Sequence, residues 1–154
     1  MVEIGKPAPD FSLPDQDGQE ITLSGLKGTP VVLYFYPKDD TPGCTKEACS
    51  FRDTFAQYER LGARIFGVSP DPVQSHVKFA KKYELPFTLL ADTDKTLCQA
   101  YGVWKEKNMY GKKAMGVERT TFVIDGRGIV RQIFPRVKVD GHSDAVLQAV
   151  KACK

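Results

Sequence analysis

Residues 31–36 read VVLYFY, a continuous apolar run with Pro30 before it and Pro37 after it. Alternate residues of a strand point to opposite faces, so a short run with no polar residue at odd or even positions is typical of a β-strand that is buried on both faces. The run therefore predicts a central strand of the hydrophobic core, and the rest of the chain has to supply the layers that cover it.

A helix is predicted after this strand, beyond a loop at residues 38–43. Apolar or semi-apolar residues recur there at steps of four, three, four and three positions, which is a helical spacing, at Cys44, Ala48, Phe51, Phe55 and Tyr58. Gly62 is expected to end this helix.

The other segments alternate between strands and helices. Strands are expected at residues 64–69 and 87–91, an N-terminal hairpin at 11–13 and 20–23, and a second hairpin at 120–125 and 129–134. Helices are expected at 71–83, with Asp71 as the N-cap and Pro72 as the first residue, at 95–101 and at 143–153. This order predicts an α/β fold with a mixed central sheet and flanking helices.

The length and charge of the chain argue against a membrane protein and a nucleic-acid-binding protein. The 154 residues fit one domain, 1–154, and no apolar run approaches the ~20 residues of a membrane span. Residues 1–10 do not resemble a signal peptide, so a cytoplasmic location is expected. The net charge of +3 is too small to indicate nucleic-acid binding, and the lysines around residues 108–111 are interpreted as a solvated loop.

The cysteines indicate redox chemistry. A close pair, Cys44 and Cys49, points to redox or metal chemistry in a reducing compartment. Cys44 falls in the first turn of the predicted helix, where unpaired N–H groups and the helix dipole favour a thiolate, the reactive form of cysteine. The same N–H groups can hold a peroxide oxygen. Thr41 precedes Cys44 by three residues and can turn its hydroxyl toward such a pocket.

Nearby carboxylates oppose a thiolate at this position. Asp39, Asp40 and Glu47 all lie within five residues of Cys44, so activation calls for a cation from elsewhere in the chain. Arg119 is the candidate, because it immediately precedes a predicted core strand and can point back over the end of the sheet.

The pattern Pro37-x-x-x-Thr41-x-x-Cys44 resembles the active-site motif of the peroxiredoxins. Its extension PGCTKEACSFRD, with a second cysteine five residues on, is similar to the bacterioferritin-comigratory, or PrxQ, subgroup. The arginine segment GVERTTFVID, the N-terminal GKPAPDFSLPDQDG and Tyr101-Gly-Val-Trp104 fit the same family, so the resemblance spans nearly the whole chain.

The resemblance implies a thioredoxin-like fold and reduction of hydrogen peroxide and small alkyl hydroperoxides. It implies that Cys44 is the peroxidatic cysteine, that Cys49 resolves it through an intramolecular disulfide, and that Pro37, Thr41 and Arg119 build the pocket. It also implies thioredoxin as the reductant, a role in antioxidant defence and a monomeric protein, with no cofactor. Whether glutaredoxin can replace thioredoxin, and which hydroperoxide is preferred, stay open.

The cysteines and histidines also have structural or metal-binding interpretations. Cys44 and Cys49 can be ordinary helix residues that pack on the sheet, although Cys49 lies beside the apolar stripe. A zinc site is disfavoured because His76 and His142 are isolated. Cys98 is expected to be a small core residue, with resolution through it as the alternative, and Cys153 is expected to be exposed and incidental.

Arg119 and Thr41, each taken alone, also have purely structural interpretations. Arg119 can be a surface residue beside a strand, and Thr41 can be a helix cap. Two rival functions are a protein disulfide oxidoreductase, which typically uses the C-x-x-C pair that this chain lacks, and a binding or holdase module with a structural cysteine pair.

Overall fold

A computed structural model describes residues 2–153, with all their side chains except that of Met109. Five strands of this part form the central sheet in the order β5-β4-β3-β8-β9. They are β3 (Val31–Phe35), β4 (Arg64–Ser69), β5 (Thr88–Ala91), β8 (Thr120–Ile124) and β9 (Val130–Phe134). Strands β3, β4 and β5 are parallel, and β8 and β9 are antiparallel to their neighbours. The mixed sheet is therefore as expected.

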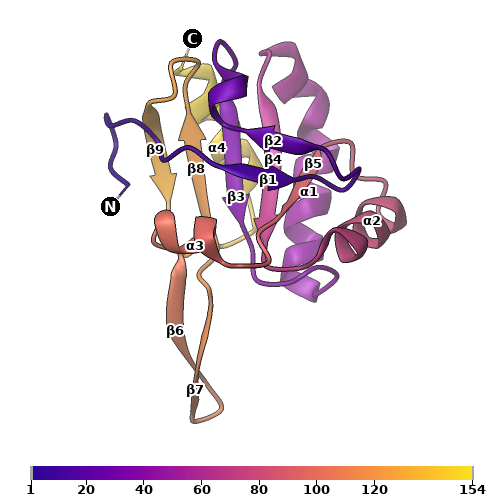
Figure 1. Cartoon of the computed structure of the whole chain (residues 1–154). Helices are drawn as coiled ribbons and strands as arrows, with labels where there is room; N and C mark the ends of the chain where they lie inside the picture. Colours follow the sequence, from indigo (N-terminus) through magenta and orange to yellow (C-terminus); the bar gives the residue numbers. More distant parts are fainter. Residues whose placement is uncertain (1, 154) are drawn as a thin grey trace.

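Layers cover the sheet on both sides (Figure 1). Helices α1 (Pro42–Arg60) and α4 (His142–Lys151) lie behind it in that view, and α2 (Val73–Lys82) lies beside β5. The ribbon of β1 (Ser12–Pro14) and β2 (Glu20–Thr22), the one-turn helix α3 (Thr96–Ala100) and the 3-10 turn η1 (Ser24–Leu26) lie in front.

The central strand explains this layering. All five residues of β3 are buried, and successive side chains point to opposite faces of a strand. Val32 and Tyr34 join the core beneath the helices, whereas Leu33 and Phe35 join the core beneath the N-terminal ribbon. A strand that feeds two cores has no face left for polar residues, which is the origin of the uninterrupted apolar run.

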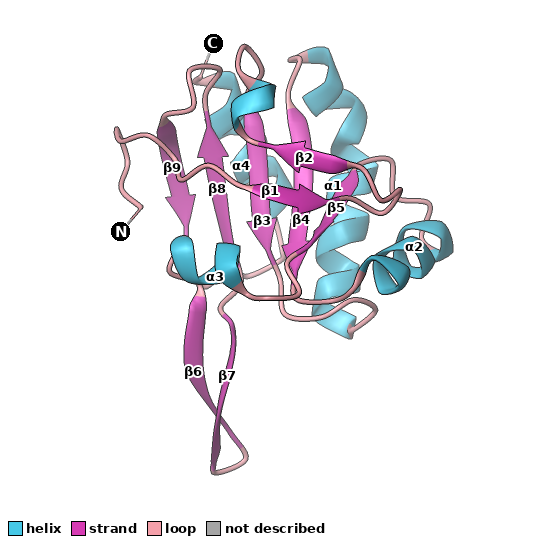
Figure 2. Cartoon of the chain, viewed as in Figure 1, coloured by secondary structure: helices cyan, strands magenta, loops and turns pink. Residues whose placement is uncertain are grey.

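Most element predictions are confirmed to within one or two residues. Both predicted hairpins form, as β1–β2 and β8–β9. Helix α1 begins at Pro42, two residues earlier than expected, and Gly62 follows its end with a φ of +70°. Figure 2 shows the alternation of helices and strands that the sequence pattern predicts.

Two local expectations are wrong. Asp71 does not cap α2: Pro72 is the N-cap residue, and the Asp71 carboxylate accepts hydrogen bonds from Ser69 and from the backbone of Asp39. The lysine cluster is not a solvated loop, because residues 104–117 form a β-hairpin of β6 (Trp104–Met109) and β7 (Lys112–Val117). Lysines and Gly111 obscured the strand pattern, because β7 is buried at Val117 and exposed over residues 112–115.

No helix in residues 2–153 is long and apolar enough to cross a membrane.

Candidate active site

Cys44 lies in the first turn of α1, where the predicted helix start placed it. The chain enters the helix through Thr41, and the first helical hydrogen bond runs from Thr45 N to the Thr41 carbonyl at 2.8 Å. The amides of Gly43 and Cys44 come before that bond and so face the site as donors. The Cys44 side chain is only 2% exposed, so these donors act in a largely dry environment.

Arg119 reaches Cys44 from the connection between β7 and β8. Its Nη2 atom lies 3.2 Å from Cys44 Sγ, and its Nη1 atom donates to Glu47 Oε1 at 2.7 Å. A Cβ atom added to Gly43 would lie 3.2 Å from the same Nη2 atom, so a glycine at this position leaves room for the guanidinium. A cation beside a thiol favours the thiolate.

Glu47 is the buried partner of this arginine. It is 1% exposed, and its second carboxylate oxygen has no hydrogen-bond partner among the described residues. Burial raises the pKa of Glu47 to about 7, against the attraction of Arg119. Burial opposes the charge of Arg119, but Glu47 and Cys44 outweigh it and keep the pKa of the guanidinium above its ordinary value. Arg119 is therefore the fixed charge of the site, and Glu47 is the group able to change charge near neutral pH.

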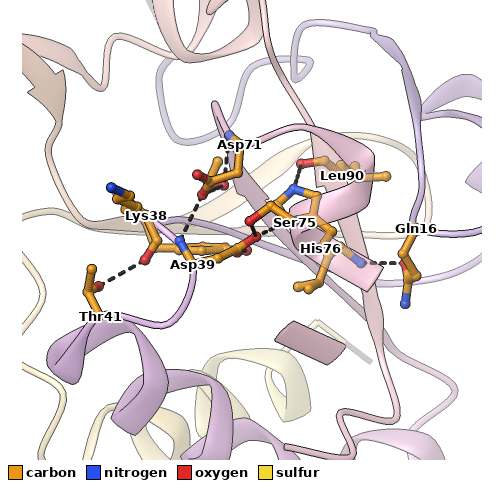
Figure 3. Close-up of polar contacts among 11 residues, drawn as sticks. Gln16, Lys38, Asp39, Thr41, Asp71, Ser75, His76 and Leu90 are labelled. Atoms are coloured by element: carbon orange, nitrogen blue, oxygen red, sulfur yellow. Dashed lines mark hydrogen bonds and ion pairs between the residues drawn. The ribbon is translucent and has the colours of Figure 1, made fainter. Parts of the chain in front are cut away.

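Thr41 and Pro37 are placed around the same helix start. The Thr41 hydroxyl donates to the Lys38 carbonyl at 2.9 Å, and no side-chain cap bond to the helix is formed. Figure 3 shows this bond at the end of the loop. A hydroxyl that donates to a carbonyl keeps its lone pairs for an incoming donor. Pro37 lies two residues beyond the end of β3 and is half-buried.

A buried polar network fixes the loop that leads to the helix (Figure 3). The Asp39 carboxylate accepts from Tyr36 at 2.5 Å, from Ser75 at 2.7 Å and from His76 Nδ1 at 2.7 Å. The other ring nitrogen of His76 lies 3.0 Å from the Leu90 carbonyl oxygen. Both ring nitrogens of His76 therefore have oxygen partners, and the buried ring is held at two points.

This network corrects the expectation that three carboxylates oppose the thiolate. Asp39 is turned toward the His76 ring, and Asp40 pairs with Lys82 and accepts from Tyr83. Glu47 meets Arg119. Each carboxylate thus has a partner of its own, and the guanidinium contacts both Glu47 and the Cys44 sulfur.

The other cysteines lie apart from this cluster. Cys49 is half-buried on α1, and all four cysteines are free thiols. Cys98 is fully buried, as expected, and burial raises the pKa of its thiol well above the ordinary value. Cys153 was expected to be exposed, and this expectation is wrong. It is half-buried, packs against the core and donates to the Ala149 carbonyl at 3.3 Å.

Two residues of the site escaped the sequence reasoning. His76 was considered only as a metal ligand, and Glu47 only as a charge that opposes the thiolate. A helical offset of three residues between Cys44 and Glu47 was the available signal, since it places both on one face. Nothing local predicted the pairing of His76 with Asp39, which are 37 residues apart. Within residues 2–153 no group of three or more metal-ligating side chains is arranged to hold a metal ion.

Comparison with known proteins agrees with this geometry. The AhpC/TSA family model matches residues 4–133. A putative peroxiredoxin bcp of Coxiella burnetii is 55% identical over 92% of this chain and 93% of its own length. Peroxiredoxin Bcp of Bacillus subtilis is 49% identical over 97% of this chain and 96% of its own.

Solved structures extend the match to the fold. The bacterioferritin comigratory protein of Xanthomonas campestris superposes with a TM-score of 0.92 at 44% identity, covering 99% of this chain and 100% of that one. The thioredoxin-like peroxiredoxin fold that the motif implied is thereby confirmed. The chain therefore belongs to the AhpC/TSA family and, within it, to the bacterioferritin-comigratory or PrxQ peroxiredoxins, which are thiol peroxidases.

Proposed function

We propose that Cys44 is the peroxidatic cysteine of this peroxiredoxin and that Arg119, Thr41 and Pro37 form its pocket. The observation that carries the proposal is the contact of 3.2 Å between Arg119 Nη2 and Cys44 Sγ at the start of α1. Guanidinium and helix amides together favour the thiolate, which is the nucleophilic form.

The first step is attack of the Cys44 thiolate on the terminal oxygen of a hydroperoxide. The sulfur–oxygen bond forms as the oxygen–oxygen bond breaks, giving a sulfenic acid and an alkoxide or hydroxide that takes up a proton. Arg119 and the amides of Gly43 and Cys44 are donors for the charge that develops on the oxygens. Thr41 is an acceptor for the hydroperoxide O–H, because its own hydrogen is engaged by Lys38.

The second step is resolution by Cys49. Its thiolate attacks the sulfenic sulfur, a disulfide forms, and hydroxide leaves as water after protonation. Five residues along an intact helix separate two Cα atoms by roughly 8.6 Å, whereas a disulfide needs them within about 7 Å. Because α1 is continuous through Cys44 and Cys49, this step requires the helix start to unwind. Thioredoxin then reduces the disulfide by thiol–disulfide exchange, and the helix re-forms.

The substrates we assign are hydrogen peroxide and small organic hydroperoxides, and the role is antioxidant defence in the cytoplasm. The similar protein from Xanthomonas campestris is described in terms of alkyl peroxide reduction. The whole activity is assigned to one domain, residues 1–154, acting as a monomer. A nearly dry sulfur favours small substrates, because little of Cys44 is accessible.

A coupled assay tests this assignment: the protein consumes peroxide while thioredoxin, thioredoxin reductase and NADPH supply the electrons, and NADPH oxidation is followed. Cys44→Ser should abolish peroxide reduction. Cys49→Ser should form the sulfenic acid once, detectable by a sulfenic-acid trap, and then lose turnover and over-oxidise. Cys98→Ser is the matched control and should keep near-normal turnover. Loss of turnover in Cys98→Ser together with normal turnover in Cys49→Ser would assign resolution to Cys98 instead.

A further inference from the structure

The β6–β7 hairpin contacts a hydrophobic core at its base, where Val117 is buried and Trp104 packs against the same core cluster. Its strands pair only with each other, from Trp104 opposite Val117 to Met109 opposite Lys112. Figures 1 and 2 show the hairpin extending from the edge of the body into solvent. A two-stranded hairpin is marginally stable at best by itself, so core packing does not account for its length.

The tip of the hairpin carries an aromatic residue that the turn itself disfavours. Tyr110 and Gly111 form the two-residue turn with φ values of +54° and +77°, and positive φ at both positions defines a type I′ turn. Asn, Asp and Gly are preferred there, and a bulky residue at positive φ is an outlier. The Tyr110 side chain is fully exposed at 101%. Neither turn chemistry nor burial explains this tyrosine, whereas exposed tyrosines are frequent anchors of protein interfaces.

The hairpin also concentrates positive charge. Residues 104–117 contain four lysines and one glutamate, so they carry the same net charge as the whole chain. Lys105 pairs with Glu118, and Lys113 is 3.8 Å from Glu106. Within residues 2–153 neither Lys107 nor Lys112 takes part in an ion pair. A surface of this composition is complementary to an acidic partner.

The base of the hairpin leads to the reaction centre, because Arg119 follows Val117 by two residues and its Nη2 atom lies 3.2 Å from Cys44 Sγ. A Cβ atom added to Gly116 would lie 3.3 Å from Lys107 Cδ, so the lysine stem lies across the backbone of β7. Burial and the neighbouring Arg119 lower the pKa of Lys107, and Cys44 acts in the opposite direction. A protein seated along the hairpin would therefore face the cysteine that carries the disulfide.

We propose that the β6–β7 hairpin is the docking surface for the protein reductant, with Tyr110 as its anchor and Lys112 as its charged contact. The partner is a small protein whose own dithiol is surrounded by an acidic face. The inference rests on the proposed function, since it names where the dithiol protein that recycles the Cys44–Cys49 disulfide is bound.

Steady-state kinetics with an acidic bacterial thioredoxin tests this surface. Tyr110→Asn removes the ring and inserts a residue that the turn prefers, so the hairpin itself should be retained. The KM for thioredoxin should rise about tenfold in Tyr110→Asn, which corresponds to the loss of one interface anchor. In Lys112→Gln the KM should rise about threefold and depend less steeply on salt. Lys81→Gln, on the exposed side of α2, is the matched charge control and should behave as wild type.

Dithiothreitol separates docking from chemistry, because a small uncharged dithiol needs no docking surface. With dithiothreitol, wild type and Tyr110→Asn should turn over at the same rate, and their single-turnover peroxide steps should agree. An unchanged KM for thioredoxin in both hairpin variants would overturn the docking surface while leaving the proposed function intact. A wild-type protein that thioredoxin fails to turn over would overturn the proposed reductant and, with it, the partner assigned to the hairpin.

Discussion

The segment before the nucleophilic cysteine and the segment after it are held in different ways. Residues 38–41, here called the clamped loop, are fixed through the buried Asp39 carboxylate and the fully buried His76 ring. Residues 42–50, the helix start, bury Cys44, Glu47 and Ala48 but also rely on polar contacts near the surface. Water can replace the surface contacts at little cost, whereas a buried polar group that loses its partner stays unsatisfied.

The contacts of the helix start show this directly. Lys46 pairs with Asp140, and both side chains are more than half exposed. Ser50 donates to Ser143 at 2.7 Å in a partly buried contact. Ala48 is fully buried but small, and the larger Phe51 that follows is also fully buried, so unwinding that passed Phe51 would open much more of the core.

This difference explains how Cys44 can react in a fixed pocket and afterwards move toward Cys49. Cys44 needs a fixed pocket to react with peroxide, and the clamped loop supplies it. Cys44 must afterwards approach Cys49, which requires the helix start to give way. Placing the cysteine at the junction lets each side keep its own stability.

Removing the anchor of the clamped loop should have the largest effect. Asp39→Ala leaves His76 Nδ1 and the hydroxyls of Tyr36 and Ser75 without their acceptor, and we expect a loss of about 3–5 kcal/mol in the free energy of unfolding. Denaturant unfolding measures it. Asp40→Asn is the matched control and should be nearly neutral, because the Asp40 pair with Lys82 is exposed and asparagine tolerates the positive φ at this position. Equal losses in the two variants would mean that the loop has no buried anchor.

Oxidation should loosen the helix start and spare the clamped loop. In the Cys44–Cys49 disulfide form, amide exchange should accelerate at least about a hundredfold over residues 45–50, because these amides lose their helical hydrogen bonds. Exchange at Tyr58, deeper in α1, should stay slow. Hydrogen exchange on both forms, with the disulfide verified by mass spectrometry, measures this. Unchanged protection over residues 45–50 would show that the bond closes without unwinding.

Arg119→Met should slow the peroxide step by about ten- to a hundredfold, because the thiolate loses its adjacent cation and the hydroperoxide loses a donor. Stopped-flow mixing of reduced protein with peroxide gives the rate, and the ultraviolet absorbance of the thiolate reports its ionised fraction. Added base should restore the rate only in part. A variant with the wild-type rate and ionised fraction would falsify the role of the contact.

Glu47 should give the helix start a modest pH dependence. Its pKa is about 7 in the folded protein against 4.5 as the ordinary value, so the folded state binds more protons between these values. The contribution of Glu47 to stability is therefore complete below about pH 4.5 and is lost as the pH rises through about 7. Between about pH 5 and pH 7.5, we expect wild type to lose about 1–2 kcal/mol relative to Glu47→Gln.

The comparison with Glu47→Gln also removes a competing contribution. Burial lowers the pKa of His142 from 6.5 to about 4, so His142 stabilises the fold above about pH 6.5 and loses this effect as the pH falls. His142 is present in both proteins and cancels in the difference. Parallel pH profiles for wild type and Glu47→Gln would show that Glu47 stays ionised throughout.

Much of the fold followed from local pattern because local pattern records burial. The run at residues 31–36 could only be a strand inside two cores, and the helical spacing after it put Cys44 in a first turn. The hairpin at residues 104–117 was missed for the same reason, since β7 is buried at Val117 but exposed over residues 112–115, which leaves no alternation of apolar and polar residues there.

The sequence by itself determined the order of strands and helices, the place of Cys44 at a helix start and, through its motif, the family. The motif also indicated Arg119 as the cation for Cys44, 75 residues away. Only the tertiary structure decided that Arg119 also meets Glu47 and that His76 meets Asp39, 37 residues away. Propensity and periodicity act over a few residues, whereas these pairs exist because the sheet brings strand ends together, so their geometry is a property of the folded chain.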